Sequence, residues 1–247
     1  MKAALLGGTK GIGRALGRLL ASNGHSLALL GRDLEDLKRS ARDMEARGGR
    51  EASEVQVVHC DLLRPETFGP ALDEAAAKLS DLDTVIVTAA VFATQEKLES
   101  DRALTRELLT VNFAHTVLFC EEARERLLSR GFGTLAVLSS VAGERGRKPV
   151  VLYGAAKAGL SAYLEGLDHK FRGRGLKTVT VKPGFVKTGM TAGLRPPPFA
   201  GEPEAVAKDV LAAIEEGRPV VYTPSAWRYV MLVIRNLPRF VMRRVEF

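Results

Sequence analysis

The chain has 247 residues, 46% of them hydrophobic and 26% charged, a composition typical of a globular protein with enough apolar material for a sizeable core. The formal net charge is +7, and much of the excess lies in residues 218–247, which hold six arginines and one acidic residue, Glu246. No apolar run approaches the roughly 20 residues that span a bilayer, and Cys60 and Cys120 lack the spacing of a metal site or a disulfide framework; these features exclude an integral membrane protein and favour a reducing, cytoplasmic setting.

Short aliphatic runs alternate with longer segments of helical period along the whole chain. Asp33 is expected to cap the second helix, and Gly48 and Gly49 to end it. Because the predicted strands are apolar on both faces, they favour a parallel sheet covered by helices on each side. Strands are predicted at 2–6, 26–30, 55–59, 84–87, 134–138, 178–181 and 219–222, with helices near 12–23, 33–47, 65–79, 101–129, 151–172 and 203–216.

These elements predict an α/β fold in which residues 1–247 form a single doubly wound Rossmann domain. The sheet is expected to have seven mostly parallel strands, with helices on both faces. In such a fold the ligand lies at the carboxyl ends of the strands. The long Gly- and Pro-rich segment 188–203, which follows the sixth strand, is therefore a candidate substrate loop.

The segment LLGGTKGIGRAL joins the first strand to the first helix and carries Gly7, Gly11 and Gly13. Glycines in such a turn allow a pyrophosphate to approach the backbone, while the helix N-terminus supplies unpaired N–H groups. The alternative is a purely structural turn. The order of strand, turn and helix at the start of a βαβ unit favours a dinucleotide-binding site.

Arg32 follows the second strand, about 20 residues beyond the glycines, where an acidic residue would bind the ribose of NAD. An arginine there suits a 2′-phosphate, and Lys10 could add a second cation. The sequence therefore favours NADP(H), with NAD(H) as the alternative. Both cations could also be merely solvated.

The segment YGAAK places Tyr153 and Lys157 four positions apart, with only small residues between them. Both therefore lie on one face of the helix predicted at 151–172. A free phenol has a pKa of about 10, and a neighbouring ammonium is expected to lower it toward neutrality. Ser140, at the end of the fifth strand, offers a hydroxyl to a carbonyl oxygen. Together these residues predict proton transfer to or from a substrate oxygen.

With these motifs the sequence resembles the short-chain dehydrogenase/reductase family over nearly its whole length. The resemblance implies that Ser140, Tyr153 and Lys157 are catalytic and that Asn112, in TVNFAHTV, supports a water relay to Lys157. It also implies a homodimer or homotetramer. Two departures are TAA in place of the family's Asn-Ala-Gly after the fourth strand, and Leu6 before the first glycine. The cofactor-binding residues implied are Gly7, Thr9, Lys10, Gly11, Ile12, Gly13, Arg32, Asp61, Leu62, Thr88, Ala89, Tyr153, Lys157, Pro183, Gly184, Val186 and Thr188.

The C-terminal tail, residues 225–247, is predicted to be basic and amphipathic, broken by Pro238 into two short helices. On a helical wheel one face holds arginines, and the apolar face could lie in a membrane interface, pack on the domain or on another subunit. The arginines could also receive a phosphate-bearing substrate. The wheel places Arg228, Arg235, Arg239 and Arg243 on the cationic face and Tyr229, Val230, Val233, Ile234, Leu237, Phe240 and Val241 opposite, with Trp227 at the start.

Segments around the catalytic motifs and WRYVMLVIRNLPR in the tail look like those of the decaprenylphosphoryl-2-keto-erythro-pentose reductases. This resemblance implies a lipid-linked keto sugar as substrate and peripheral contact with a membrane surface. The alternatives are a reductase for a free lipid, acyl-carrier or small ketone substrate, and a catalytically idle NADP(H)-binding sensor or scaffold. Nucleic acid is not an expected partner, because no aromatic-interleaved basic groove accompanies the charge. No metal is expected from the scattered His25, His59, His115 and His169.

Overall fold

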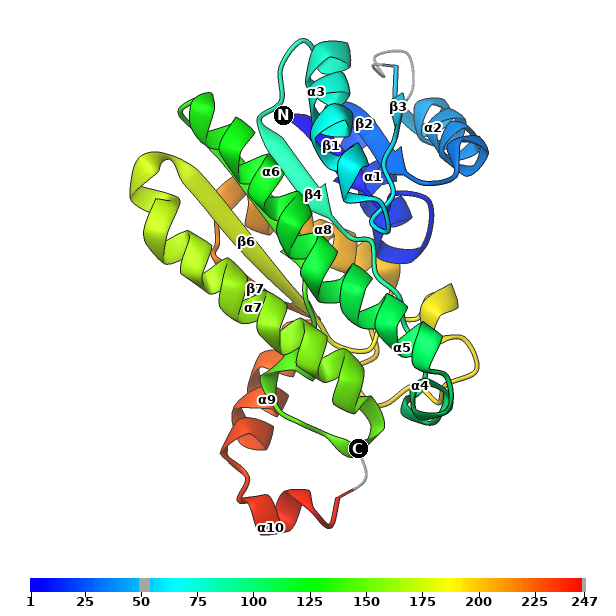
Figure 1. Ribbon diagram of the computed structural model, residues 1–247, viewed down its shortest axis with the longest axis vertical. Coiled ribbons are helices and arrows are strands. Elements are labelled where there is room, and N and C mark those ends of the chain that lie inside the picture. Colours follow the sequence, from blue (N-terminus) through cyan, green and yellow to red (C-terminus); the bar gives the residue numbers. More distant parts are fainter. Residues whose placement is uncertain (49–53, 246–247) are drawn as a thin grey trace.

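The computed structural model describes residues 1–48 and 54–245, and its centre is a seven-stranded parallel sheet (Figure 1). The strand order is β3-β2-β1-β4-β5-β6-β7, and every neighbouring pair is parallel, so the predicted fold class is confirmed and its "mostly parallel" sheet is wholly parallel in the described residues. The strands are β1 (Lys2–Leu6), β2 (Ser26–Gly31), β3 (Gln56–His59), β4 (Thr84–Val87), β5 (Gly133–Leu138), β6 (Leu176–Pro183) and β7 (Val220–Thr223).

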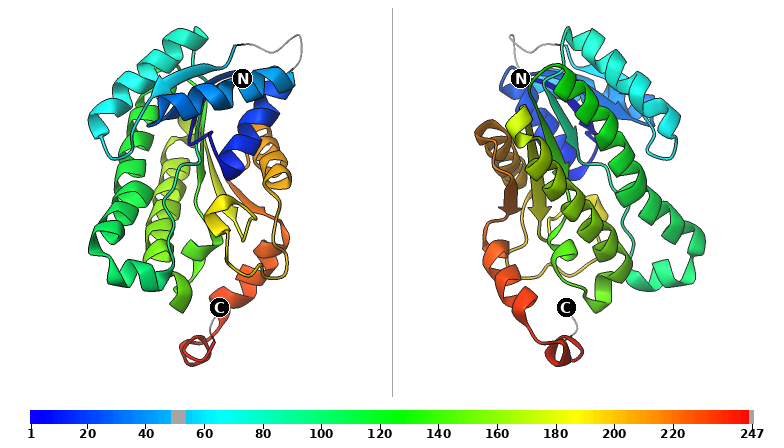
Figure 2. Two further views of the ribbon diagram at one scale, coloured as in Figure 1. Left: turned by 90° about the vertical axis from the view of Figure 1, so that its right-hand side faces the viewer. Right: turned by 60° about the vertical axis from the view of Figure 1, so that its left-hand side comes forward.

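Helices cover both faces of the sheet, as Figure 2 shows in its edge-on view. Because alternate strand residues point to opposite faces, Leu5 joins one hydrophobic cluster and Leu6 the other. The first cluster is completed by α1 (Gly11–Ser22), α2 (Leu34–Gly48) and α8 (Pro203–Glu216), and the second by α3 (Phe68–Leu79), α6 (Thr116–Ser129) and α7 (Val151–Phe171).

The second helix begins as predicted, because Asp33 Oδ1 accepts hydrogen bonds from the backbone N–H groups of Glu35 and Asp36, both at 3.0 Å. Gly48 is its last residue, and Gly49 lies outside the described residues. Short helical turns occur at η2 (Pro65–Thr67), η4 (Val141–Glu144), η5 (Lys148–Val150), η6 (Arg172–Arg174) and η7 (Gly189–Thr191).

The helix predicted near 101–129 is confirmed as one uninterrupted helical segment over residues 102–129, but it contains a π-helical turn that was not predicted. The structure has α5 (Arg102–Leu109), a π-helical turn η3 (Thr110–His115) and then α6, preceded by the unpredicted α4 (Gln95–Ser100). Just after the π-helical turn, the Thr116 hydroxyl donates a hydrogen bond to the Val111 carbonyl within the turn at 2.6 Å. The widened turn brings Asn112 toward the segment after β4.

The tail forms two helices, α9 (Ala226–Asn236) and α10 (Arg239–Met242), separated at Leu237–Pro238 as predicted. Both lie at the end of the molecule toward which the last strands run (Figures 1 and 2). α9 buries Trp227, Met231 and Ile234 against the domain. The expected apolar face is therefore corrected: Tyr229, Val233 and Phe240 are exposed, whereas Met231 is fully buried.

No helix in the described part of the chain is long and apolar enough to cross a membrane.

Candidate active site

One large cavity, of about 1440 Å³, lies at the carboxyl ends of the strands. The strand order reverses between β1 and β4, which is where a doubly wound sheet opens a crevice for ligands. The structure brings nearly all the residues singled out from the sequence into its wall: Gly7, Thr9, Lys10, Gly11, Ile12, Gly13, Arg32, Asp61, Leu62, Thr88, Ala89, Ser140, Tyr153, Lys157, Pro183, Gly184, Val186 and Thr188.

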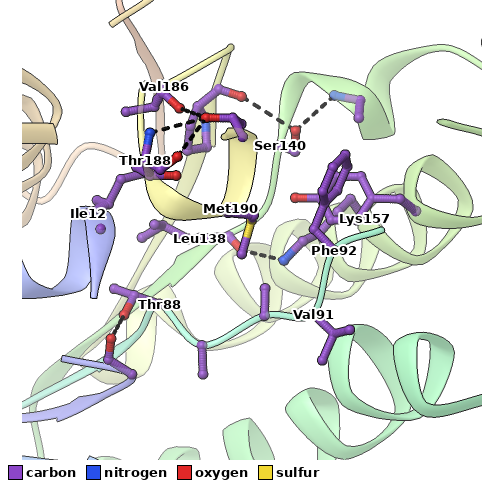
Figure 3. A pocket seen from close by; sticks show the side chains of 18 of the residues that line it. Ile12, Thr88, Val91, Phe92, Leu138, Ser140, Lys157, Val186, Thr188 and Met190 are labelled. Atoms are coloured by element: carbon purple, nitrogen blue, oxygen red, sulfur yellow. Dashed lines mark hydrogen bonds between the residues drawn. The ribbon is translucent and has the colours of Figure 1, made fainter. Parts of the chain in front are cut away.

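The glycine turn between β1 and α1 requires residues without a side chain. Gly7 has φ +96°, and a Cβ on Gly13 would lie 2.2 Å from the Gly7 carbonyl oxygen. The Thr88 hydroxyl, in place of the family's asparagine, donates to the Leu6 and Gly7 carbonyls at 3.1 and 3.0 Å (Figure 3). No side chain caps the N-terminus of α1, so its N–H groups face the cavity.

The end of the cavity beyond β2 is lined by Arg32 and Asp61. Arg32 is exposed and forms no hydrogen bond or ion pair with any described side chain, while the neighbouring Asp33 is engaged in capping α2. Asp61 Oδ1 accepts from the Leu63 N–H at 2.9 Å, which fixes the turn after β3. A 2′-phosphate would fit this end, since the guanidinium is available there and Lys10, which is also exposed, lines the same cavity.

At the other end, Ser140 and Tyr153 present their hydroxyls to one point. Ser140, directly after β5, donates to the Pro183 carbonyl at 3.4 Å and accepts from the Ala142 N–H at 3.1 Å. The Tyr153 ring meets the Phe92 ring edge-on, with centroids 5.2 Å apart. Burial raises the pKa of Tyr153 to about 12, and a hydrogen bond with Ser140 opposes part of that rise. The phenol therefore keeps its proton at neutral pH.

Lys157 lies one helical turn beyond Tyr153 and is only 2% exposed (Figure 3). Its Nζ donates to the Leu138 carbonyl at 2.8 Å and lies 5.9 Å from the centroid of the Tyr153 ring. Burial lowers the pKa of Lys157 to about 8, so the side chain is still mainly charged at pH 7. The expected lowering of the phenol pKa by this ammonium is not found: burial raises that pKa, and the opposing effect comes from the hydrogen bond with Ser140.

Asn112 is the one candidate residue that does not line the cavity. It is 1% exposed, and its side chain accepts from the Val91 N–H and donates to the Val91 carbonyl, both at 2.7 Å. It thereby fixes the segment that carries Phe92 over Tyr153. The side chain is a positioning residue in this structure, and the water relay implied by the resemblance stays a prediction.

Several cavity residues were not predicted from the sequence to line the site, although Trp227 and Ile234 were placed in the amphipathic tail and Met190 in the candidate substrate loop. Trp227 and Ile234 of α9, Met190 of the loop after β6, and Arg147 before α7 all belong to the wall. A Cβ on Gly184 would lie 2.1 Å from Trp227 Nε1, so this glycine lets the indole pack across the end of β6. No local pattern marks these residues, because each reaches the cavity through contacts between distant segments.

A parallel sheet with this strand order, a glycine turn at the switch point and a Ser–Tyr–Lys group at the opposite end define a nucleotide-dependent oxidoreductase of the Rossmann class. The model of the short chain dehydrogenase family matches residues 2–198, and the chain belongs to this family. It is an oxidoreductase that acts on carbonyl or alcohol groups, and members of its family use NAD(P)H.

The chain is similar to several known proteins over most of its length. An uncharacterized oxidoreductase of Mycobacterium tuberculosis is 32% identical, with 98% of this chain and 95% of the relative covered. A 3-oxoacyl-[acyl-carrier-protein] reductase of Aquifex aeolicus is 30% identical, with 85% and 88% covered. The solved structure of an actinorhodin polyketide ketoreductase variant with NADPH has a TM-score of 0.79 at 19% identity, with 89% and 94% covered, and supports the fold.

Proposed function

We propose that the protein reduces a ketone to a secondary alcohol with NADPH. Ser140 holds the substrate oxygen by a hydrogen bond, and Tyr153 donates its phenolic proton to that oxygen. Lys157, buried and charged one turn away, stabilises the negative charge that develops on the phenol oxygen. The nicotinamide supplies the hydride when bound. In the reverse direction Tyr153 accepts the proton. The observation that carries this proposal is the convergence of Ser140, Tyr153 and Lys157 on the cavity that also holds the glycine turn.

We expect Arg32→Ala to remove the preference for NADPH over NADH. A charge-assisted hydrogen bond to the 2′-phosphate contributes about 1.5–3 kcal/mol, so the ratio of the two dissociation constants should change roughly 10- to 100-fold. Fluorescence titration of wild type and variant with each nucleotide measures this ratio. Arg42→Ala, an exposed arginine on α2 outside the cavity wall, is the control and should leave the ratio unchanged. An undiminished preference in Arg32→Ala would assign the 2′-phosphate to another group.

We infer further that the ketone is carried on a lipid, as in the keto-pentose reductases that the sequence resembles. Support comes from the substrate end of the cavity, where the loop after β6 and α9 form apolar walls. Phe199 on the loop is 60% exposed and Val233 on α9 is 63% exposed, so apolar surface continues from the cavity to the outside. The Trp227 indole donates to the Phe199 carbonyl at 3.0 Å and holds the two walls together.

The exposed side of the tail supports contact with an anionic lipid surface. Tyr229 and Phe240 are 69% and 61% exposed, and Arg239 and Arg243 are exposed beside them. Arg235 is different, because it forms an ion pair with Glu144 at 3.2 Å. Deleting the tail would also remove buried Trp227 and Met231, so point variants at exposed positions are the sharper test.

We expect Phe240→Ser to weaken sedimentation with vesicles that contain anionic lipid, relative to wild type. Phe132→Ser is the control, since Phe132 is 58% exposed at the start of β5, far from the tail. Vesicles of zwitterionic lipid alone should bind both proteins weakly. Equal sedimentation of wild type and Phe240→Ser would remove the tail from membrane contact.

The second candidate is a reductase of a free lipid, acyl-carrier or small ketone substrate. It is favoured by the 30% identity to a protein named as a 3-oxoacyl-[acyl-carrier-protein] reductase. Turnover of soluble 3-oxoacyl thioesters that exceeds turnover of a lipid-phosphate ketone would favour it.

A homodimer or homotetramer stays a prediction, for which Leu109, Phe113 and Leu118 offer exposed apolar side chains along α5–α6. The idle sensor or scaffold would require a protein that binds NADPH and turns over neither substrate.

A further inference from the structure

Arg147 lies in the wall of the cavity with its charge uncompensated. Its Nε is buried and has no hydrogen-bond partner, and no described carboxylate forms an ion pair with its guanidinium. Burial lowers the pKa of Arg147, and no neighbouring acid offsets that effect. Arg147 as a whole is half-buried, and a partly buried guanidinium without a counter-charge costs the folded state stability, which makes its presence in a ligand cavity informative.

The residues beside Arg147 are engaged in holding the tail. Glu144 forms ion pairs with Lys182 and Arg235, and Arg145 Nη2 donates to the Leu237 carbonyl at 2.9 Å. Arg147 makes no such contact with α9 or any other described element. A structural role like that of Arg145 therefore does not account for it.

The backbone around Arg147 is held firmly next to the start of α7, the helix that carries Tyr153. Its carbonyl accepts from the Val150 N–H at 3.2 Å, in the turn that leads into α7 and Tyr153. The preceding turn is pressed against α7, since a Cβ on Gly143 would lie 2.6 Å from the Lys157 carbonyl carbon. Arg147 is thus fixed at the substrate end of the cavity, away from the Arg32 end.

We propose that Arg147 binds an anionic group, a phosphate or a carboxylate, on the substrate, while the apolar part of that substrate lies against Trp227, Val230 and Ile234 of α9. A guanidinium pairs with either oxyanion through two parallel N–H···O bonds, and the α9 side chains supply the apolar wall of the same cavity. Arg147 then determines specificity for acidic amphiphilic ketones over neutral ones. This inference rests on the proposed reductase function, because only a reductase would bind the anionic molecule as a ketone substrate. The test measures binding alone and does not require activity.

Trp227 makes a direct binding test possible, because it is the single tryptophan of the chain and lies in the cavity wall. The protein is first saturated with NADP⁺, so that added phosphate does not occupy the glycine turn. Trp227 fluorescence is then titrated with n-octyl phosphate, n-octanol and inorganic phosphate, each below any micellar concentration. The variants are Arg147→Gln, Arg147→Lys and, as the control, Arg102→Gln, an exposed arginine at the start of α5 outside the cavity wall.

In wild type, octyl phosphate should bind roughly 10- to 100-fold more tightly than octanol, the range expected for a charge-assisted hydrogen bond. Arg147→Gln should abolish this preference, Arg147→Lys should restore part of it, and Arg102→Gln should keep it. Tighter binding of octyl phosphate than of inorganic phosphate identifies an amphiphile, whereas equal binding identifies a free anion and overturns the apolar half of the proposal.

Equal affinity of the wild-type protein for octyl phosphate and octanol would overturn the role of Arg147. This comparison uses wild-type protein alone, so it does not depend on whether a variant folds. So would an unchanged preference in Arg147→Gln. Because the titration measures no turnover, failure here leaves NADPH-dependent ketone reduction standing. Conversely, if activity assays detected no NADPH-dependent ketone reduction, the titration could still show an anion-binding site at Arg147.

Discussion

Tyr153→Phe is expected to abolish ketone reduction while leaving NADPH binding close to that of wild type. The variant keeps the ring that packs edge-on against Phe92 and removes only the hydroxyl that would donate the proton. General acid catalysis contributes roughly 10²–10⁴-fold to a rate, so kcat should fall by at least that range while KM changes little. Steady-state kinetics with NADPH and fluorescence titration of the nucleotide measure both effects.

Tyr163→Phe is the matched control for this change. Tyr163 lies on the same helix, α7, and its hydroxyl donates to Glu121 Oε1 at 2.6 Å outside the cavity wall. Losing that hydrogen bond should cost stability and leave kcat unchanged. Wild-type turnover in Tyr153→Phe would remove the phenol from the mechanism and leave Ser140 as the remaining hydroxyl donor.

Gly13→Ala should strongly weaken both the fold and the cofactor site. The added Cβ would lie 2.2 Å from the Gly7 carbonyl oxygen and 2.4 Å from the Thr88 hydroxyl, so the backbone of the turn must shift. Overpacking of this kind costs roughly 1–3 kcal/mol of unfolding free energy. Misplacing one N–H that faces the pyrophosphate costs about 1.5–3 kcal/mol, roughly 10- to 100-fold in the dissociation constant of NADPH.

Gly166→Ala, on α7, controls for the general effect of replacing a helical glycine by alanine. No atom lies within 4 Å of the Cβ that this substitution would add. Its higher helix propensity should stabilise the protein by up to about 1 kcal/mol, opposite in sign to Gly13→Ala. Denaturant unfolding and NADPH titration of both variants make the comparison. If Gly13→Ala bound NADPH normally, the close approach at Gly7 would have no part in cofactor binding.

The sequence predicted most of the fold because the signals for it are local. Strands β1 and β4 and helix α8 were placed to the residue, the other strand boundaries shifted by one or two positions, and α3 begins three residues later than predicted, after the turn η2. Alternation of aliphatic runs with helical periods depends on nearest neighbours in the chain, as does the choice of Asp33 as a cap. Residues 102–129 are helical as predicted, but the π-helical turn within them was not, and the Asn112 side chain in that turn is bound to Val91, which lies outside the segment.

The chemistry of the site could be predicted for a similar reason. Tyr153 and Lys157 are one helical turn apart, and the glycines of the turn lie within seven consecutive residues, so each motif carries its own geometry. The electrostatics could not be predicted. The pKa of Tyr153 is raised rather than lowered, because the phenol is buried in the assembled cavity, while the Lys157 Nζ is bound to the Leu138 carbonyl.

The amino-acid sequence by itself determined the α/β class and pointed to the candidate cofactor turn and candidate catalytic side chains, since these follow from short-range periodicity and residue chemistry. Only the tertiary structure decided how the tail is used. It buries Met231, pairs Arg235 with Glu144 and lays Trp227 across Gly184. Arg147 is left without a partner by the same packing. These outcomes depend on contacts between segments tens of residues apart, which the strand order brings together and no local pattern encodes.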